Sequence, residues 1–79
     1  MKKPVKKPLD KRVRKICDKL KKMRIDKGFT SYENFAWDND LPRVQYWRLE
    51  SGVNFRIESL LKILDVHKIT LEDFFKGIK

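Results

Sequence analysis

The chain has 79 residues, and its 20 Lys and Arg against 11 Asp and Glu give a formal net charge of +9. A chain of this length fits one domain with a thin core, which leaves little room for a cofactor cleft. The basic excess favours an anionic partner, nucleic acid before an acidic membrane surface, although solubility alone also explains it.

Two classes of protein are disfavoured by the sequence. The basic start of the chain is not followed by an apolar run, and no stretch approaches about 18 apolar residues, so we expect neither a signal peptide nor a membrane span. Cys17 is the only cysteine, which excludes an intrachain disulfide and suits a reducing cytoplasm.

The chain divides into two segments. Residues 1–12 are rich in lysine and interrupted by Pro4 and Pro8, which predicts a basic flexible N-terminal tail, either an arm that touches phosphates or a solubilising terminus. Residues 13–79 predict one all-α domain, because apolar residues recur there at three- and four-residue spacing. No segment alternates long enough to predict a strand.

Five short helices are expected in this domain. The first begins near Val13, with Asp10 as a candidate N-cap, and ends at Gly28. Ser31 can cap the second, which runs from Tyr32 to about Asn39.

The third helix is expected over residues 43–51, between Pro42 and Gly52. A broad apolar face marks the fourth helix, and Thr70 with Asp73 forms a capping pair at the start of the fifth. The apolar residues of these last two helices are Ile57, Leu60, Leu61, Ile63, Leu64, Leu71, Phe74 and Phe75.

The stretch SYENFAWDNDLPRVQYWRLESG places two short helices on either side of a tight turn. Phe35 and the small Ala36 face inward before the turn, and Leu41, Tyr46 and Leu49 face inward after it. With its flanking residues, this stretch resembles the Cro/C1-type (lambda-repressor-like, XRE) helix-turn-helix family from about Val13 to Phe75. The resemblance implies a compact five-helix lambda-repressor-like DNA-binding domain with the helix-turn-helix at helices two and three.

The resemblance also implies an ion pair between Arg24 and Glu50 that ties helix one to helix three. The sequence departs from the family at Asp40, which replaces a turn glycine, and at His67-Lys68, which replace Leu-Gly. Asp tolerates left-handed backbone, so the turn stays feasible.

Helix three would enter the major groove of DNA in this family. Its outward residues can contact base edges, because Arg bonds guanine, Gln bonds adenine and apolar side chains touch the thymine methyl group. For Trp47 two alternatives stay open, contact with DNA or packing on the protein. The expected base-contacting residues are Arg43, Val44, Gln45, Trp47 and Arg48.

Phosphate contacts are expected from the turns around this helix, with Lys22 and Lys27 as further candidates. The expected residues are Ser31, Tyr32, Pro42, Asn54 and Arg56. No metal-ligand spacing, nucleophile–base pair or glycine-rich phosphate loop is visible, so we expect no metal, no cofactor and no enzyme activity.

The function that follows is binding of double-stranded DNA by a small bacterial or phage transcriptional regulator, a repressor by preference, in the cytoplasm at the nucleoid. The resemblance implies a homodimer, for which Phe74, Phe75 and Ile78 are candidate contacts unless the phenylalanines complete the core. Two alternatives keep the fold: an antitoxin that binds a toxin partner, or a protein- or RNA-interaction module that uses exposed tryptophans.

Overall fold

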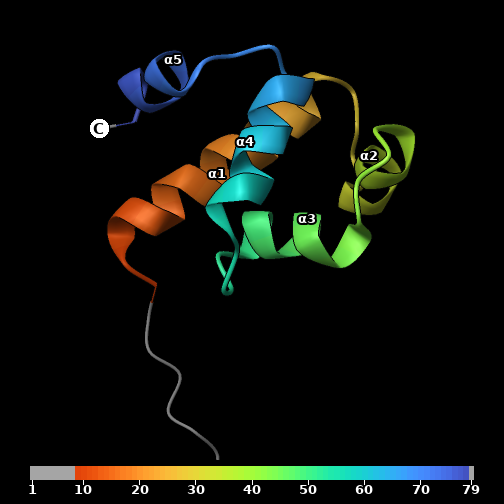
Figure 1. The fold of residues 1–79 in the computed structure, drawn as a ribbon, viewed down its shortest axis with the longest axis horizontal. Helices are drawn as coiled ribbons and strands as arrows, with labels where there is room; N and C mark the ends of the chain where they lie inside the picture. Colours follow the sequence, from red (N-terminus) through yellow and green to blue (C-terminus); the bar gives the residue numbers. More distant parts are fainter. Residues whose placement is uncertain (1–8, 79) are drawn as a thin grey trace, which may run out of the picture.

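The computed structural model describes residues 9–78 and contains five α-helices and no strand within them (Figure 1). The expectation of an all-α domain of five short helices is therefore confirmed. The predicted tail lies largely outside the described residues. The helices are α1 (Lys11–Asp26), α2 (Tyr32–Asp38), α3 (Arg43–Ser51), α4 (Ile57–Val66) and α5 (Leu71–Lys76).

The first helix begins at Lys11, so the placement of residues 11 and 12 in the tail was wrong. The Asp10 carboxylate accepts hydrogen bonds from the backbone N–H and the guanidinium of Arg12, and these bonds hold the first turn in helical form. They also lower the pKa of Asp10 below its ordinary value, because they stabilise the charged carboxylate.

Side-chain caps start α2 and α5 as the sequence predicts. Ser31 accepts hydrogen bonds from the backbone N–H groups of Glu33 and Asn34, and Thr70 accepts one from Asp73. Such a cap stabilises a helix by about 1 kcal/mol. The structure places Pro42 at the N-cap of α3, where its missing N–H costs nothing.

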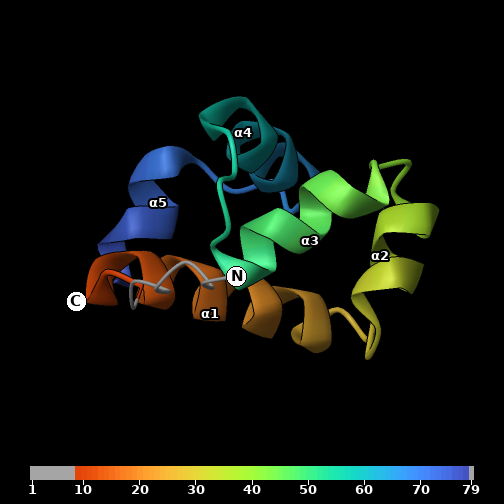
Figure 2. The same cartoon turned by 90° about the horizontal axis from the view of Figure 1, so that it is seen from below.

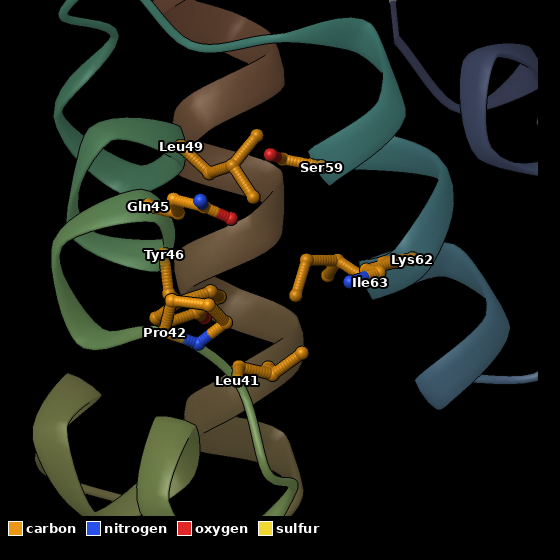
Figure 3. Close-up of a pocket in the computed structure, with 8 residues that line it drawn as sticks. All are labelled: Leu41, Pro42, Gln45, Tyr46, Leu49, Ser59, Lys62 and Ile63. Atoms are coloured by element: carbon orange, nitrogen blue, oxygen red, sulfur yellow. The ribbon is translucent and has the colours of Figure 1, made fainter.

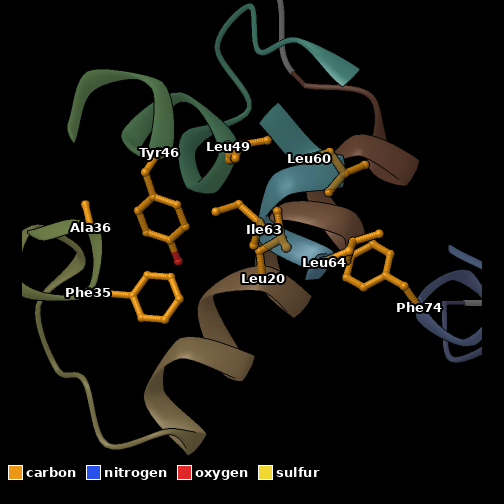
Figure 4. Packing of buried hydrophobic residues seen from close by; sticks show 9 residues of the cluster. All are labelled: Leu20, Phe35, Ala36, Tyr46, Leu49, Leu60, Ile63, Leu64 and Phe74. Carbon is orange, nitrogen blue, oxygen red and sulfur yellow. The ribbon is translucent and has the colours of Figure 1, made fainter. Parts of the chain in front are cut away.

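The core lies between α3 and the helices around it (Figure 4). Full burial of one such side chain stabilises the fold by about 1.5–3 kcal/mol. The inward placement of Phe35, Ala36, Tyr46 and Leu49 is confirmed, since each is at most 1% exposed. The buried cluster comprises Leu20, Phe35, Ala36, Tyr46, Leu49, Leu60, Ile63, Leu64 and Phe74.

Four of the apolar residues on the last two helices are exposed. Ile57 and Leu61 of α4, and Leu71 and Phe75 of α5, have 39% to 59% of their surface accessible. On α4 the buried residues are Leu60, Ile63 and Leu64, and on α5 the buried residue is Phe74, so each helix buries only one narrow stripe. Phe74 is fully buried, so it completes the core and does not offer a dimer contact.

The arrangement leaves one helix at the edge of the domain. In Figure 1 α3 lies at the lower edge with no helix beneath it. Seen from below, α3 runs between α1 and α4, with α2 at one end (Figure 2). Within the described part of the chain, no helix combines the length and apolar character that crossing a membrane requires.

Candidate nucleic-acid interface

A tight turn sets the angle between α2 and α3. Asp40 adopts left-handed backbone with φ +58°, and the Leu41 N–H donates to the Ala36 carbonyl at 2.8 Å. This bond closes the end of α2 in the manner of a Schellman motif, with Asp40 in the position that glycine usually takes. The small side chain of Ala36 is buried here, which lets the two helices approach closely.

A buried ion pair fixes α3 against α1. Arg24 donates to both carboxylate oxygens of Glu50, at 2.8 and 3.1 Å, and to the Phe29 carbonyl at 2.7 Å. The Tyr46 hydroxyl donates to the same carboxylate. The ion pair expected from the sequence is thus present, with its side chains 5% and 10% exposed. Its role is to hold α3 in one orientation, because unpairing either charge in this setting is costly.

The side of α3 that faces away from the core is exposed along its whole length. We call Arg43, Val44, Trp47 and Arg48 the outer face of α3. The Val44 and Trp47 side chains, 54% and 42% exposed, lie in the middle of this face and the two arginines flank them. Trp47 is therefore only partly exposed and is not folded into the core. Together with Val44 it forms an apolar surface between the guanidinium groups of the two arginines.

Arg43 is held towards α2. Its guanidinium donates to the Glu33 carboxylate at 3.2 Å, and both side chains are more than half exposed. An exposed pair of this kind is worth about 0–1 kcal/mol, so a stronger acceptor can replace Glu33 at small cost. The sequence does not predict the pairing of Glu33 with Arg43, because this pairing depends on the angle between α2 and α3.

The other flank of the outer face opens into a polar cleft of about 150 Å³ between α3, the α3–α4 loop and the start of α4. Arg48 and Arg56 line this cleft from opposite elements, with Gln45, Asn54 and Ser59. Asn54 adopts left-handed backbone with φ +48°, which turns the chain so that Arg56 returns towards α3. Two guanidinium groups in one small polar cleft favour an anion such as a phosphate.

Gln45 lies on the α4 side of α3, next to Leu49, Ser59 and Lys62 (Figure 3). The apolar niche beneath it has a volume of only about 10 Å³, the room of a single water molecule. This niche is a packing seam between two helices and is too small for a ligand. Lys62 extends the basic character of this flank onto α4, next to Gln45, Arg56 and Ser59. In the sequence, its i, i+3 spacing from Ser59 is the signal that both residues lie on the same face of α4.

The remaining predicted phosphate contacts lie near the start of α2 and α3. Pro42 is exposed, whereas Tyr32 is half-buried and packs against the core. Ser31 is occupied as a cap. Lys22 pairs with Asp26 on α1 at 3.1 Å. The structure therefore brings together Arg48, Asn54 and Arg56, and keeps Ser31 and Tyr32 apart from that cleft.

No set of three metal-ligating side chains converges anywhere in residues 9–78. The chain matches no known family model, no curated protein and no solved structure. Any function proposed for it has to come from the geometry and charge of its own residues.

Proposed function

We propose that the chain is a sequence-specific double-stranded DNA-binding protein of the Cro/C1-type helix-turn-helix class, with a lambda-repressor-like fold, and that it regulates transcription. The observation that carries this proposal is the outer face of α3, an exposed helix that presents two arginines around an apolar centre. The closed α2–α3 turn and the buried Arg24–Glu50 pair support it, because they hold that helix rigidly at the edge of the domain.

The outer face has the chemistry needed to distinguish bases. A guanidinium can donate two hydrogen bonds to O6 and N7 of guanine, and one good bidentate contact discriminates by about 1–3 kcal/mol. Val44 and Trp47 offer apolar surface to a thymine methyl group. In this proposal Arg43 exchanges its exposed bond with Glu33 for a base edge, and Gln45 and Arg48 contact bases on the α4 side.

Phosphate binding would come from the cleft beside the same helix. Arg48 and Arg56 line it, and Asn54 contributes an amide that can donate a hydrogen bond. A phosphate held there would fix the register of α3 along the groove, because backbone contacts position a protein and base contacts give it specificity. Contacts to phosphates of the opposite DNA strand would come from Pro42, Ser31 and Tyr32.

The exposed tryptophans favour a second candidate, a platform for single-stranded RNA or DNA. Trp37 of α2 is 88% exposed and Trp47 is 42% exposed. Stacking of one base on an aromatic ring is worth about 1–3 kcal/mol and tolerates any sequence. This candidate predicts that single strands bind more tightly than duplex, whereas the proposed DNA-binding function predicts the reverse.

An NMR titration locates the interface directly. A random-sequence duplex is added to the ¹⁵N-labelled chain at physiological salt, and a single strand of the same composition serves as the matched ligand. We expect the largest shifts at Arg43 to Arg48 and at Asn54 to Arg56, with the duplex bound more tightly. Shifts confined to α4 and α5, or preference for the single strand, would refute the assignment.

A further inference from the structure

The four residues of the outer face of α3 form two matched side-chain pairs. Arg43 and Trp47 are four residues apart on the helix, and so are Val44 and Arg48. Residues at this spacing are neighbours on a helix surface, with about 5–6 Å between their Cβ atoms. Each exposed arginine therefore lies beside one exposed apolar side chain, 42% exposed in Trp47 and 54% in Val44.

The chemistry of each side-chain pair selects a particular combination of groups in the major groove. A guanidinium bonds O6 and N7 of guanine, and an apolar side chain contacts a methyl group at C5 of a pyrimidine. In a T·A base pair that methyl group lies opposite adenine, whose N6 and N7 suit Asn or Gln instead. The outer face contains neither of these residue types. Its side-chain pairs therefore match a methyl group that accompanies a guanine.

A methylated CpG step contains this combination twice. Each 5-methylcytosine carries its methyl group at the position where thymine carries one, and each is paired with guanine. The step thus offers two guanines and two methyl groups in two consecutive base pairs. An unmethylated CpG step lacks the methyl groups, a TpA step lacks the guanines, and a TpG step has only one of each.

We propose that the outer face of α3 reads cytosine-5-methylated CpG, so that the chain distinguishes methylated from unmethylated duplex. Arg43 with Trp47 reads one 5-methylcytosine·guanine pair, and Arg48 with Val44 reads the other. Arg48 lies where the outer face meets the polar cleft, so Arg56 remains in that cleft to hold a phosphate. The inference rests on the duplex binding proposed above and adds the class of DNA that this site takes.

The outer face is prepared for this contact in the free chain. More than half of the Trp47 surface is already covered by the protein, which reduces the ordering that binding requires. Arg43 is held by Glu33 at 3.2 Å, in an exposed pair that gives way at small cost. Burial of one methyl group strengthens binding about fourfold, and burial of two about fifteenfold.

Competition between barcoded duplex pools tests the inference. Each pool has random flanks without CpG around one central step, which is methylated CpG, unmethylated CpG or TpA. Equal amounts of the three pools compete for a limiting amount of the full chain at physiological salt, and sequencing counts the retained barcodes. We expect the methylated CpG pool to exceed each of the other two about tenfold.

Variants of the apolar residues link this preference to the outer face. Trp47→Ala and Val44→Ser should each reduce the preference for methylated over unmethylated CpG about fourfold. Trp37→Ala is the matched control and should leave the preference unchanged, because Trp37 is exposed on α2 and lies outside the outer face. Circular dichroism of each variant verifies that its helices are intact.

Three results would overturn the inference while duplex binding itself stands. They are equal retention of methylated and unmethylated CpG, a methyl preference that both Trp47→Ala and Val44→Ser leave unchanged, and retention of TpA at the level of methylated CpG. Absence of retention in all three pools is a different outcome, because it would remove the DNA-binding function and this inference with it.

Discussion

At the scale of single residues, the most constrained group is Glu50. Its carboxylate accepts hydrogen bonds from Arg24 and Tyr46 inside the α1–α3 contact, and it is the acidic partner of the buried Arg24 guanidinium. The bond from Glu50 raises the pKa of Arg24, because it stabilises the charged form. Glu33 accepts a single bond from Arg43 at the surface, so the two glutamates differ in burial and in the number of bonds they accept.

We predict that Glu50→Ala lowers the free energy of unfolding by about 3–5 kcal/mol, because it leaves the Arg24 charge buried without a counterion. Glu33→Ala is the control and should cost less than about 1 kcal/mol. Urea denaturation followed by circular dichroism measures both. Equal, small losses for the two variants would contradict a structural role for the buried pair.

His67 gives a pH dependence of known sign. Its ring stacks on Phe35, with 5.4 Å between centroids, and its Nε2 atom is buried without a hydrogen-bond partner. Burial, and then the charge of Lys27, lowers the pKa of His67 below its ordinary 6.5. The unfolded chain therefore binds this proton more readily than the folded one, so stability is lost as the pH falls below about 6.5.

The chain has one histidine, so the change in stability between pH 7 and 5.5 reports this group above all. We predict a melting temperature that declines across this window, and a much flatter profile for His67→Phe, which keeps the stacked ring. Thermal denaturation at a series of pH values measures it. An equally steep decline in the variant would show that other groups are responsible.

At the scale of helices, the ends of α2 and α4 use non-glycine residues in left-handed backbone. Lys68 has φ +57° after α4, and the Ile69 N–H donates to the Leu64 carbonyl at 3.0 Å. Left-handed backbone costs a residue with a Cβ atom roughly 1–2 kcal/mol. Lys68 thus occupies the position where glycine is favoured, and the core contacts of Ile69 hold it there.

Lys68→Gly should raise the free energy of unfolding by about 1 kcal/mol, because it removes that strain. The matched control is Lys21→Gly in the middle of α1, which should lower it by about 1 kcal/mol. Urea denaturation distinguishes the two signs. A loss of stability in Lys68→Gly would mean that the lysine side chain makes a contact worth more than the strain.

The outer face of α3 and the cleft beside it predict different consequences for DNA binding. Arg43→Ala should relax the base preference at one position by about 1–3 kcal/mol. Arg56→Ala should weaken binding to all DNA sequences alike. It should also reduce the salt dependence of the binding constant by the amount expected for about one phosphate contact. Fluorescence anisotropy against a panel of duplexes at several salt concentrations measures both. Equal, sequence-independent losses from the two variants would contradict the assignment of roles.

Much of the fold was predictable because its signals are local. The helix-turn-helix pattern predicts Ala36, Tyr46 and Leu49 inward, and residue type predicts Ser31 and Thr70 as caps; the structure agrees on each. The exposure of Ile57 and Phe75 was not predictable, because it depends on which side of each helix its neighbours cover. The Arg43–Glu33 bond and the Arg48–Arg56 cleft likewise arise only when α2, α3 and the α3–α4 loop take their places.

At the scale of the whole molecule, charge and apolar surface are separated. The basic excess belongs to the first 56 residues, which include α3 and residues of its cleft, and the neutral remainder carries the exposed apolar residues Ile57, Leu61, Leu71 and Phe75. Such a division suits a protein that meets a polyanion through its basic segment.

The central claim, that α3 recognises a DNA sequence, is tested most directly by binding selection. The full chain is incubated with a random duplex library at physiological salt, and the retained duplexes are sequenced. The account predicts an enriched motif that is lost in Arg43→Ala. Uniform, salt-sensitive retention of all duplexes without enrichment would contradict it, because it would leave charge attraction without base recognition.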